Sequence, residues 1–97
     1  MSKGYWVTSY RKTNDAAALA AYAQLALPAI TAAGGKFIVR GPAEEVREHG
    51  LKERTVVIEF PTYEQAVAAY DSPDYKKALA ALGDAAERDL RIVRGAE

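Results

Sequence analysis

The sequence contains no cysteine and a single histidine, His49. Without thiols the chain cannot form a disulfide, a thiolate nucleophile or a zinc site built on cysteines, and one imidazole cannot supply the repeated ligands of many metal centres. His49 also lies beside Gly50 in a polar segment, which favours an exposed turn residue over a metal ligand, a proton shuttle or an axial haem ligand. We therefore expect no metal and no cofactor.

The chain also lacks an excess of charge of either sign, since 13 Lys and Arg balance 13 Asp and Glu. No whole-domain field draws it to nucleic acid or to an anionic membrane surface. No apolar run is long enough for a signal peptide or a membrane span, so a cytoplasmic location is expected. The length of 97 residues suits one compact domain, predicted over residues 1–97.

Residue periodicity predicts four strands. Residues 4–10 are nearly all β-branched or aromatic, and residues 36–40 form a second such run. Residues 54–60 hold the continuous β-branched stretch typical of a central strand. Residues 87–94 alternate apolar and charged side chains, which gives a fourth strand with one apolar face.

Two helical regions separate these strands. Apolar residues at steps of three and four predict a helix over residues 15–33, capped by Thr13-Asn14-Asp15 and ended by Gly34-Gly35. Pro28 removes one backbone hydrogen bond and predicts a bend at residues 24–28.

The second helical region starts at Thr62-Tyr63-Glu64-Gln65, which has the form of a capping box. Ser72-Pro73 interrupts it, because Ser caps a new turn and Pro fits the first helical position. The final segment, residues 73–82, places Tyr75 on an apolar stripe and ends at Gly83.

The segment after the second strand is ambiguous. Gly41-Pro42 predicts a β-bulge, since glycine permits unusual backbone angles and proline cannot donate to a ladder. Residues 43–48 either continue the strand in a polar, edge-like form or make a short helical turn.

The resulting order βαββαβ predicts an α+β, ferredoxin-like fold with a four-stranded antiparallel sheet and both helices on one face. Alternation assigns to the helix side Val56, Ile58, Phe60, Leu90 and Ile92, and to the other side Thr55, Val57, Glu59, Asp89, Arg91 and Val93. The uncovered face is thus partly apolar, and a second copy of the chain would cover it, so we expect a homodimer. A monomer with a solvated sheet face is the alternative.

Several segments resemble the domain-of-unknown-function family 1330. The match rests on Tyr5-Trp6, Tyr22, residues 34–41, Val57-Ile58-Glu59-Phe60-Pro61 and Tyr70-Asp71-Ser72-Pro73-Asp74-Tyr75, and it covers nearly the whole chain. Departures are Pro42, where a second glycine is usual, and Ala16, where proline is frequent. The resemblance implies a dimeric α+β barrel, in which two sheets pack face to face. It implies no particular reaction, because the superfamily includes monooxygenases, isomerases, haem enzymes and ligand-sensing modules.

Glu59 is the one charged residue of the otherwise uncharged run 55–60. It is a candidate catalytic base or hydrogen-bond anchor, and the alternative is a structural ion pair with Arg40, Arg91 or a partner-chain cation. Hairpin pairing near Gly50 predicts Arg40 opposite Phe60, within reach of Glu59. Arg40 could equally bind a substrate carboxylate.

Aromatic residues supply the other candidate site groups. Tyr22, Tyr70 and Tyr75 lie on alanine-rich helices, where they either pack in the core or present hydroxyl donors to a cleft. Trp6 could form the floor of a pocket for a planar ligand or be core. Ser72 has no histidine beside it in the sequence to activate it, so we interpret it as a helix cap.

These residues support a hypothesis with two forms. The first is a homodimer that binds a small aromatic or carboxylated metabolite in a cleft between sheet and helices, with cofactor-independent proton transfer or oxygenation. Its site would be Glu59 as base, Arg40 as anion anchor, Tyr22 and Tyr70 as donors, and Trp6. The second is a non-catalytic, dimeric ligand-binding or structural module. Glu59 paired with Arg40, beside no enclosed cavity, would contradict the enzyme.

Overall fold

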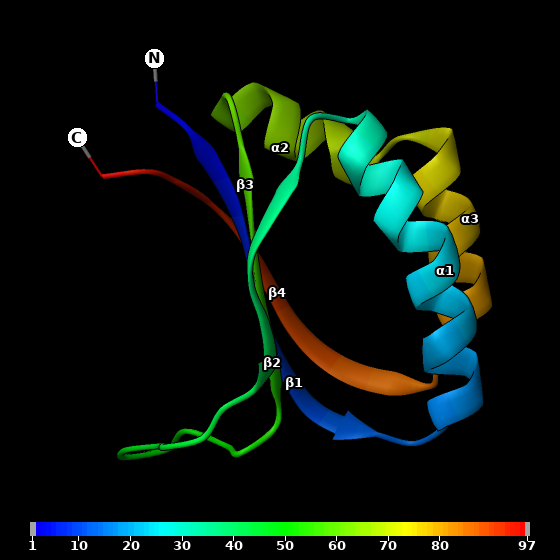
Figure 1. Ribbon diagram of the computed structural model, residues 1–97, viewed down its shortest axis with the longest axis vertical. Helices are drawn as coiled ribbons and strands as arrows, with labels where there is room; N and C mark the ends of the chain where they lie inside the picture. Colours follow the sequence, from blue (N-terminus) through cyan, green and yellow to red (C-terminus); the bar gives the residue numbers. More distant parts are fainter. Residues whose placement is uncertain (1, 97) are drawn as a thin grey trace.

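The computed structural model describes residues 2–96 and has the order predicted from the sequence, with the second helical region split in two. Figure 1 shows the elements in place. They are β1 (Gly4–Thr13), α1 (Ala16–Ala32), β2 (Lys36–Pro42), β3 (Arg54–Phe60), α2 (Tyr63–Tyr70), α3 (Pro73–Leu82) and β4 (Ala86–Arg94). Among the described residues, no helix is long and apolar enough to cross a membrane.

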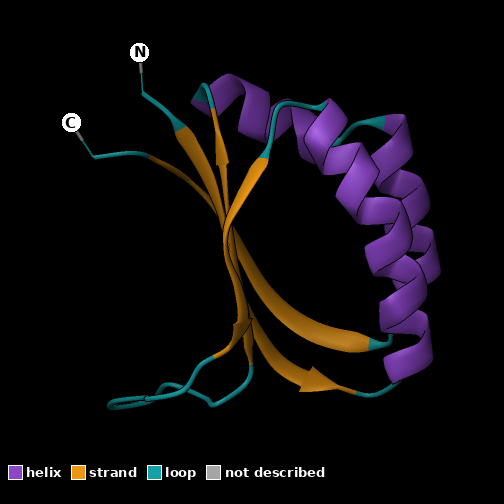
Figure 2. Cartoon of the chain, in the orientation of Figure 1, coloured by secondary structure: helices purple, strands orange, loops and turns teal. Residues whose placement is uncertain are grey.

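The four strands form one antiparallel sheet in the order β2-β3-β1-β4. All helices lie on the same side of this sheet (Figure 2), which confirms the ferredoxin-like fold. The central strands β1 and β3 pair in register from Gly4 opposite Phe60 to Ser9 opposite Thr55. The predicted assignment of β3 is confirmed, since Val56, Ile58 and Phe60 are buried.

The helix starts follow the predicted caps. The side chains of Asp15 and Thr62 each accept a hydrogen bond from the backbone amide three residues later, both at 3.1 Å. Ser72 accepts from the Tyr75 amide at 3.3 Å, and Pro73 occupies the first turn of α3. α1 continues through Pro28 as one helix, and the bend there stays a prediction.

The predicted bulge is in the wrong place. The register shift in β2 lies between Phe37 and Val39, so Ile38 is the extra residue, while Gly41 and Pro42 remain in the ladder opposite Thr55 and Arg54. Pairing of Phe37 with Ile58 in the core fixes the register, and this contact between strands outweighs the local glycine-proline signal. Residues 43–53 form an irregular loop, so both alternatives for residues 43–48 are wrong. The polar segment buries too little apolar surface to hold either structure.

The core is centred on Trp6, whose side chain is 1% exposed. Its indole Nε1 donates to the Ala66 carbonyl at 2.7 Å, and its ring packs against Phe60 and Tyr75 with centroids 5.3 and 4.9 Å apart. α2 lies directly on β1, because a Cβ at Gly4 would stand 2.6 Å from the Cα of Tyr63. Trp6 therefore links β1, β3 and two helices.

The sheet surface away from the helices, here called the open face, has an apolar centre with charged residues at both ends. Its middle row comprises Val39, Val57 and Val7, followed by Arg91 on β4. Val39 and Val93 are 47% and 40% exposed. Loop 43–53 and the segments leading to both chain ends extend toward this side (Figure 1). They form rims at opposite ends of the open face.

Candidate functional site

A cavity of about 260 Å³ lies between α1 and the helix-facing side of the sheet. The side chains of α1 that face it include Ala16, Ala20, Ala23 and Ala26, which are too short to fill the space above the strands. Larger residues complete the walls, among them Leu19 and Ile30 from the same helix. The predicted cleft between sheet and helices is therefore present, near the lower size limit of small-molecule pockets.

The cavity floor changes from apolar to cationic along the strands. Trp6, Phe37 and Ile58 occupy one register row, since Trp6 and Phe37 both pair with Ile58. Beyond them, toward loop 43–53, the lining includes Arg40, Arg54 and Arg88, and it contains no Asp or Glu. Among residues 2–96 these three arginines form no ion pair. The cavity thus combines an apolar end with uncompensated positive charge.

Of these three arginines, Arg88 has the most interactions with neighbouring side chains. Its Nη1 donates to Tyr22 Oη at 3.0 Å, and Tyr22 Oη lies 2.7 Å from Tyr75 Oη. The guanidinium stacks over the rings of Tyr10 and Tyr22, 5.7 and 5.0 Å from their centroids. Burial opposes the charged form of Arg88, but the neighbouring phenol oxygens raise its pKa on balance. Burial raises the pKa of Tyr75 far above its usual value, so this phenol is neutral at physiological pH.

The structure brings together only some of the candidate residues. Tyr22, Arg40 and Trp6 line the cavity. Tyr70 does not, because its ring packs against Trp6 and Tyr75 at centroid distances of 5.7 and 5.3 Å. Glu59 lies on the open face, on the opposite side of the sheet from the cavity.

The predicted pairing of Arg40 is wrong. Arg40 lies opposite Val56 rather than Phe60, which directs it to the helix side, where its guanidinium stacks 5.3 Å from the Phe37 ring centroid. The shift follows from the bulge at Ile38 and from the length of loop 43–53. Arg40 and Glu59 are consequently on different faces and do not pair. A Glu59–Arg40 ion pair together with the lack of a cavity would contradict an enzyme. Within residues 2–96 the two residues form no ion pair, and a cavity is present.

Glu59 is held by the N-terminal segment. Tyr5 Oη donates to it at 3.0 Å, and Lys3 Nζ lies 3.4 Å away. The hydrogen bond from Tyr5 lowers the pKa of Glu59 most, burial opposes it, and Lys3 and Lys36 lower it further. The same hydrogen bond raises the pKa of Tyr5. Glu59 is therefore an ionised anchor on the open face.

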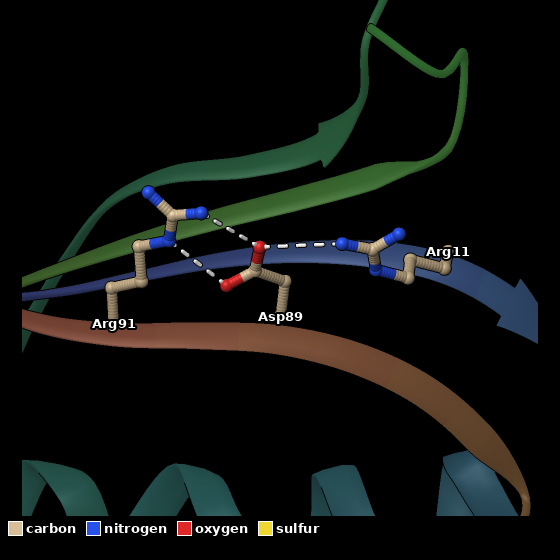
Figure 3. A network of polar contacts seen from close by, with 3 residues as sticks. All are labelled: Arg11, Asp89 and Arg91. Atoms are coloured by element: carbon tan, nitrogen blue, oxygen red, sulfur yellow. Dashed lines mark hydrogen bonds and ion pairs between the residues drawn. The ribbon is translucent and has the colours of Figure 1, made fainter. Parts of the chain in front are cut away.

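The opposite end of the open face carries a second ionic group (Figure 3). Asp89 accepts from Arg91 Nε and Nη2 at 3.1 and 3.2 Å, and Arg11 Nη2 lies 3.7 Å from its carboxylate. The bond from Arg91 is the main reason that the pKa of Asp89 is lowered. Charged groups thus flank the apolar centre at both ends.

We expect Glu59→Gln to change the acid sensitivity of the fold. The folded-state pKa of Glu59 is lowered, so its ionised form stabilises the protein fully above the ordinary pKa of 4.5, and this contribution disappears as the pH falls through the folded value. Between about pH 5 and about pH 3 the wild-type melting temperature should fall more steeply than that of Glu59→Gln.

Thermal unfolding at a series of pH values measures this effect. Glu87→Gln is the control, because the side chain of Glu87 is exposed and forms no hydrogen bond or ion pair with the described residues. Its melting curve should follow that of the wild type. Parallel profiles for wild type and Glu59→Gln would contradict the anchoring role of Glu59.

Two cavity residues, Arg54 and Arg88, were not identified as site candidates from the sequence, whereas Tyr75 was considered as a hydroxyl donor together with Tyr22 and Tyr70. The sequence does indicate which way Arg88 faces, because Arg88 lies two residues before the helix-facing Leu90 and therefore on the same face of the strand. The Tyr22–Tyr75 contact joins residues 53 apart and depends on how α1 packs against α3.

His49 is exposed in loop 43–53, as predicted. Within residues 2–96 no three acidic or histidine side chains are grouped to hold a metal ion.

Comparisons with known proteins agree with this fold. A family model described as "Domain of unknown function (DUF1330)" matches residues 3–96. A solved protein of unknown function from Rhodopseudomonas palustris is 17% identical, with a TM-score of 0.77, over 99% of this chain and 84% of that one. SnoaB, a cofactor-independent oxygenase from Streptomyces nogalater, is 12% identical, with a TM-score of 0.62, over 100% and 96%. A dimeric ferredoxin-like protein of unknown function from Thermobifida fusca is 17% identical, with a TM-score of 0.57, over 96% and 91%. No curated protein matches the sequence.

Proposed function

Because the chain belongs to the DUF1330 family, whose description assigns no activity, we propose its function from the cavity: a homodimeric protein that binds a small aromatic or carboxylated metabolite between α1 and the sheet. The observation that carries this proposal is a cavity lined by three arginines and by no carboxylate, with aromatic side chains at its other end. A planar ligand with one acidic group matches both ends.

Electrostatics favour an anionic ligand. A cation that is partly removed from water is stabilised only when an anion or hydrogen-bond acceptors replace the lost hydration. Arg54 is half-buried and Arg40 is exposed at the cavity mouth, and neither has an ion-pair partner among residues 2–96. A guanidinium binds a carboxylate through two parallel hydrogen bonds, which fixes the orientation of the acid as well as its charge. Phe37, Trp6 and Ile58 would then contact the ring of the ligand.

The homodimer is the second part of the proposal. The open face exposes a row of valines bounded by the ionic groups of Glu59 and Asp89. A two-fold copy would cover the valines and leave the charges near the edges, which is the usual distribution in interfaces. The rims formed by loop 43–53 and the chain ends would flank the partner (Figure 1). The dimeric relative from Thermobifida fusca supports this assembly for the fold.

A catalytic form of the proposal is cofactor-independent proton transfer or oxygenation. The similarity to SnoaB supports the fold alone at 12% identity. Glu59, the base inferred from the sequence, lies across the sheet from the cavity, so it cannot reach a ligand in the cavity of its own chain. Binding without a Glu59-catalysed step is the function that the geometry supports best.

Matched ligand pairs test the proposal. We expect benzoate and indole-3-acetate to bind at least about tenfold more tightly than their neutral amides, since a hydrogen bond to a charged group contributes about 1.5–3 kcal/mol. Isothermal titration calorimetry measures both members of each pair. Arg40→Gln should weaken binding of the acids and leave that of the amides unchanged.

Lys77→Gln is the control for this experiment, because it removes one exposed positive charge on α3 outside the cavity. It should bind the acids like the wild type. Equal affinities for acids and amides, or no binding of either, would contradict the proposed function.

A further inference from the structure

One polar cluster in the cavity wall consists of Arg88, Tyr22 and Tyr75. All three residues line the cavity, and they come from β4, α1 and α3. One phenol oxygen contacts the other at 2.7 Å, and Arg88 Nη1 donates to Tyr22 Oη at 3.0 Å. The rings of Tyr22 and Tyr75 meet nearly edge to face, with an interplanar angle of 79°. Packing on three elements therefore fixes the positions of the three polar groups.

The cluster has more hydrogen-bond donors than acceptors. A phenol carries one donated hydrogen, and a guanidinium carries five N–H donors and no acceptor. The contact between the two phenols uses one of their two hydrogens. The only oxygens that the cluster contains are those of the phenols themselves, because within residues 2–96 no carboxylate or carbonyl accepts from it. One phenol hydrogen and several guanidinium hydrogens remain for a ligand.

The direction of the remaining phenol hydrogen follows from burial. Tyr75 is 1% exposed, and its hydroxyl has no other oxygen to donate to among the described residues. A buried donor without an acceptor is costly, so Tyr75 donates to Tyr22. Tyr22 Oη then accepts from both Tyr75 and Arg88, and its own hydrogen is free to point into the cavity.

We propose that Arg88, Tyr22 and Tyr75 form an oxyanion site, and that the ligand of this cavity is a planar phenol or enol bound through its deprotonated oxygen. This inference rests on the proposed function, and it adds the chemical class and the contact point of the acidic group. On binding, the O–H bond of the ligand breaks, its electron pair stays on the oxygen, and the proton passes to the buffer. The site is complementary to such an oxygen because it offers a full positive charge and a preorganised phenol donor without any competing carboxylate.

4-Nitrophenol is the probe, because its phenol and phenolate forms have different visible spectra. The bound probe should titrate at least one pH unit below the free probe, which corresponds to at least tenfold tighter binding of the phenolate than of the phenol. Spectra recorded across neutral pH with protein in excess give both midpoints. Calorimetry below the midpoint of the free probe, in two buffers of different ionisation enthalpy, should register proton release on binding as a difference between the two heats.

Two variants locate the effect. Arg88→Gln removes the charge, and Tyr22→Phe removes only the hydroxyl that faces the probe, so Tyr22→Phe remains informative if the charge substitution disturbs folding. Either variant should lose most of the shift in the bound midpoint. Lys77→Gln, which removes an exposed charge outside the cavity, should keep the full shift.

The possible outcomes separate this inference from the proposed function. If nitrophenol and the aromatic carboxylates all fail to bind, the proposed function and the oxyanion site are both wrong. If the carboxylates bind through Arg40 but bound nitrophenol titrates like the free probe, only the oxyanion site is wrong. A lowered midpoint that persists in both variants would also overturn the assignment to Arg88 and Tyr22.

Discussion

Trp6→Ala is expected to destabilise the protein by about 3–5 kcal/mol, the range for removing a fully buried large aromatic side chain. The indole is 1% exposed and contacts the rings of Phe60, Tyr70 and Tyr75. Its loss would leave a void where β1 meets the helices, and it would remove the 2.7 Å hydrogen bond to the Ala66 carbonyl. Since domains of this size are stable by about 5–15 kcal/mol, a substantial part of the molecules would unfold near physiological temperature.

Urea denaturation at fixed protein concentration measures this loss, because assembly makes the apparent stability depend on concentration. Trp6→Phe separates the two contributions: it keeps an aromatic ring in the core and removes the indole donor, so it should cost less than Trp6→Ala. Tyr63→Ala is the surface control, since it removes a half-buried ring whose described partner is the Arg94 guanidinium, 4.1 Å from the centroid. A loss below about 1 kcal/mol for Trp6→Ala would contradict the central role of this side chain.

Val57→Asp is expected to convert the proposed homodimer into a monomer. Val57 lies between Val39 and Val7 at the centre of the open face. In a dimer an aspartate here would face the apolar centre of the partner's sheet, where an unpaired charge costs several kcal/mol. In a monomer the same carboxylate would remain in contact with water, since Val57 is only half-buried in the single chain.

Sedimentation equilibrium measures the assembly directly. The wild type should have about twice the chain mass of 10.5 kDa, and Val57→Asp should have the mass of one chain. Val67→Asp is the matched control, because Val67 is 36% exposed on α2, on the helix side of the sheet, and should leave the mass unchanged. A wild type that is monomeric at micromolar concentration, or a Val57→Asp variant that stays dimeric, would contradict the assembly.

Local signals predicted most of the fold. The caps at Asp15, Thr62 and Ser72 each depend on a hydrogen bond three residues along the chain, so short sequence windows contain the necessary information. The two-residue period of side chains along a strand likewise assigned Val56, Ile58 and Phe60 to the buried face of β3. These features require no knowledge of which strands are neighbours.

The errors arose where the outcome depended on contacts between distant segments. Whether the bulge falls at Ile38 or at Gly41 depends on how Phe37 meets Ile58 across the sheet. That choice sets the face on which Arg40 lies, and therefore separates it from Glu59. The Tyr22–Tyr75–Arg88 cluster draws on three elements, and no single window of sequence contains it.

The strand order has a consequence for how the chain folds during synthesis. β1 is synthesised first, but its two neighbours in the sheet are β3 and β4, with Gly4 paired to Phe60 on one side and to Arg94 on the other. Neither edge of this strand can be paired until most of the chain has left the ribosome. Pairings that span such long separations fold slowly, because the loop must close before any contact compensates for the lost entropy. The complete sheet therefore forms only after translation of β4, and Trp6 of β1 lacks its ring partners until Phe60, Tyr70 and Tyr75 have been synthesised.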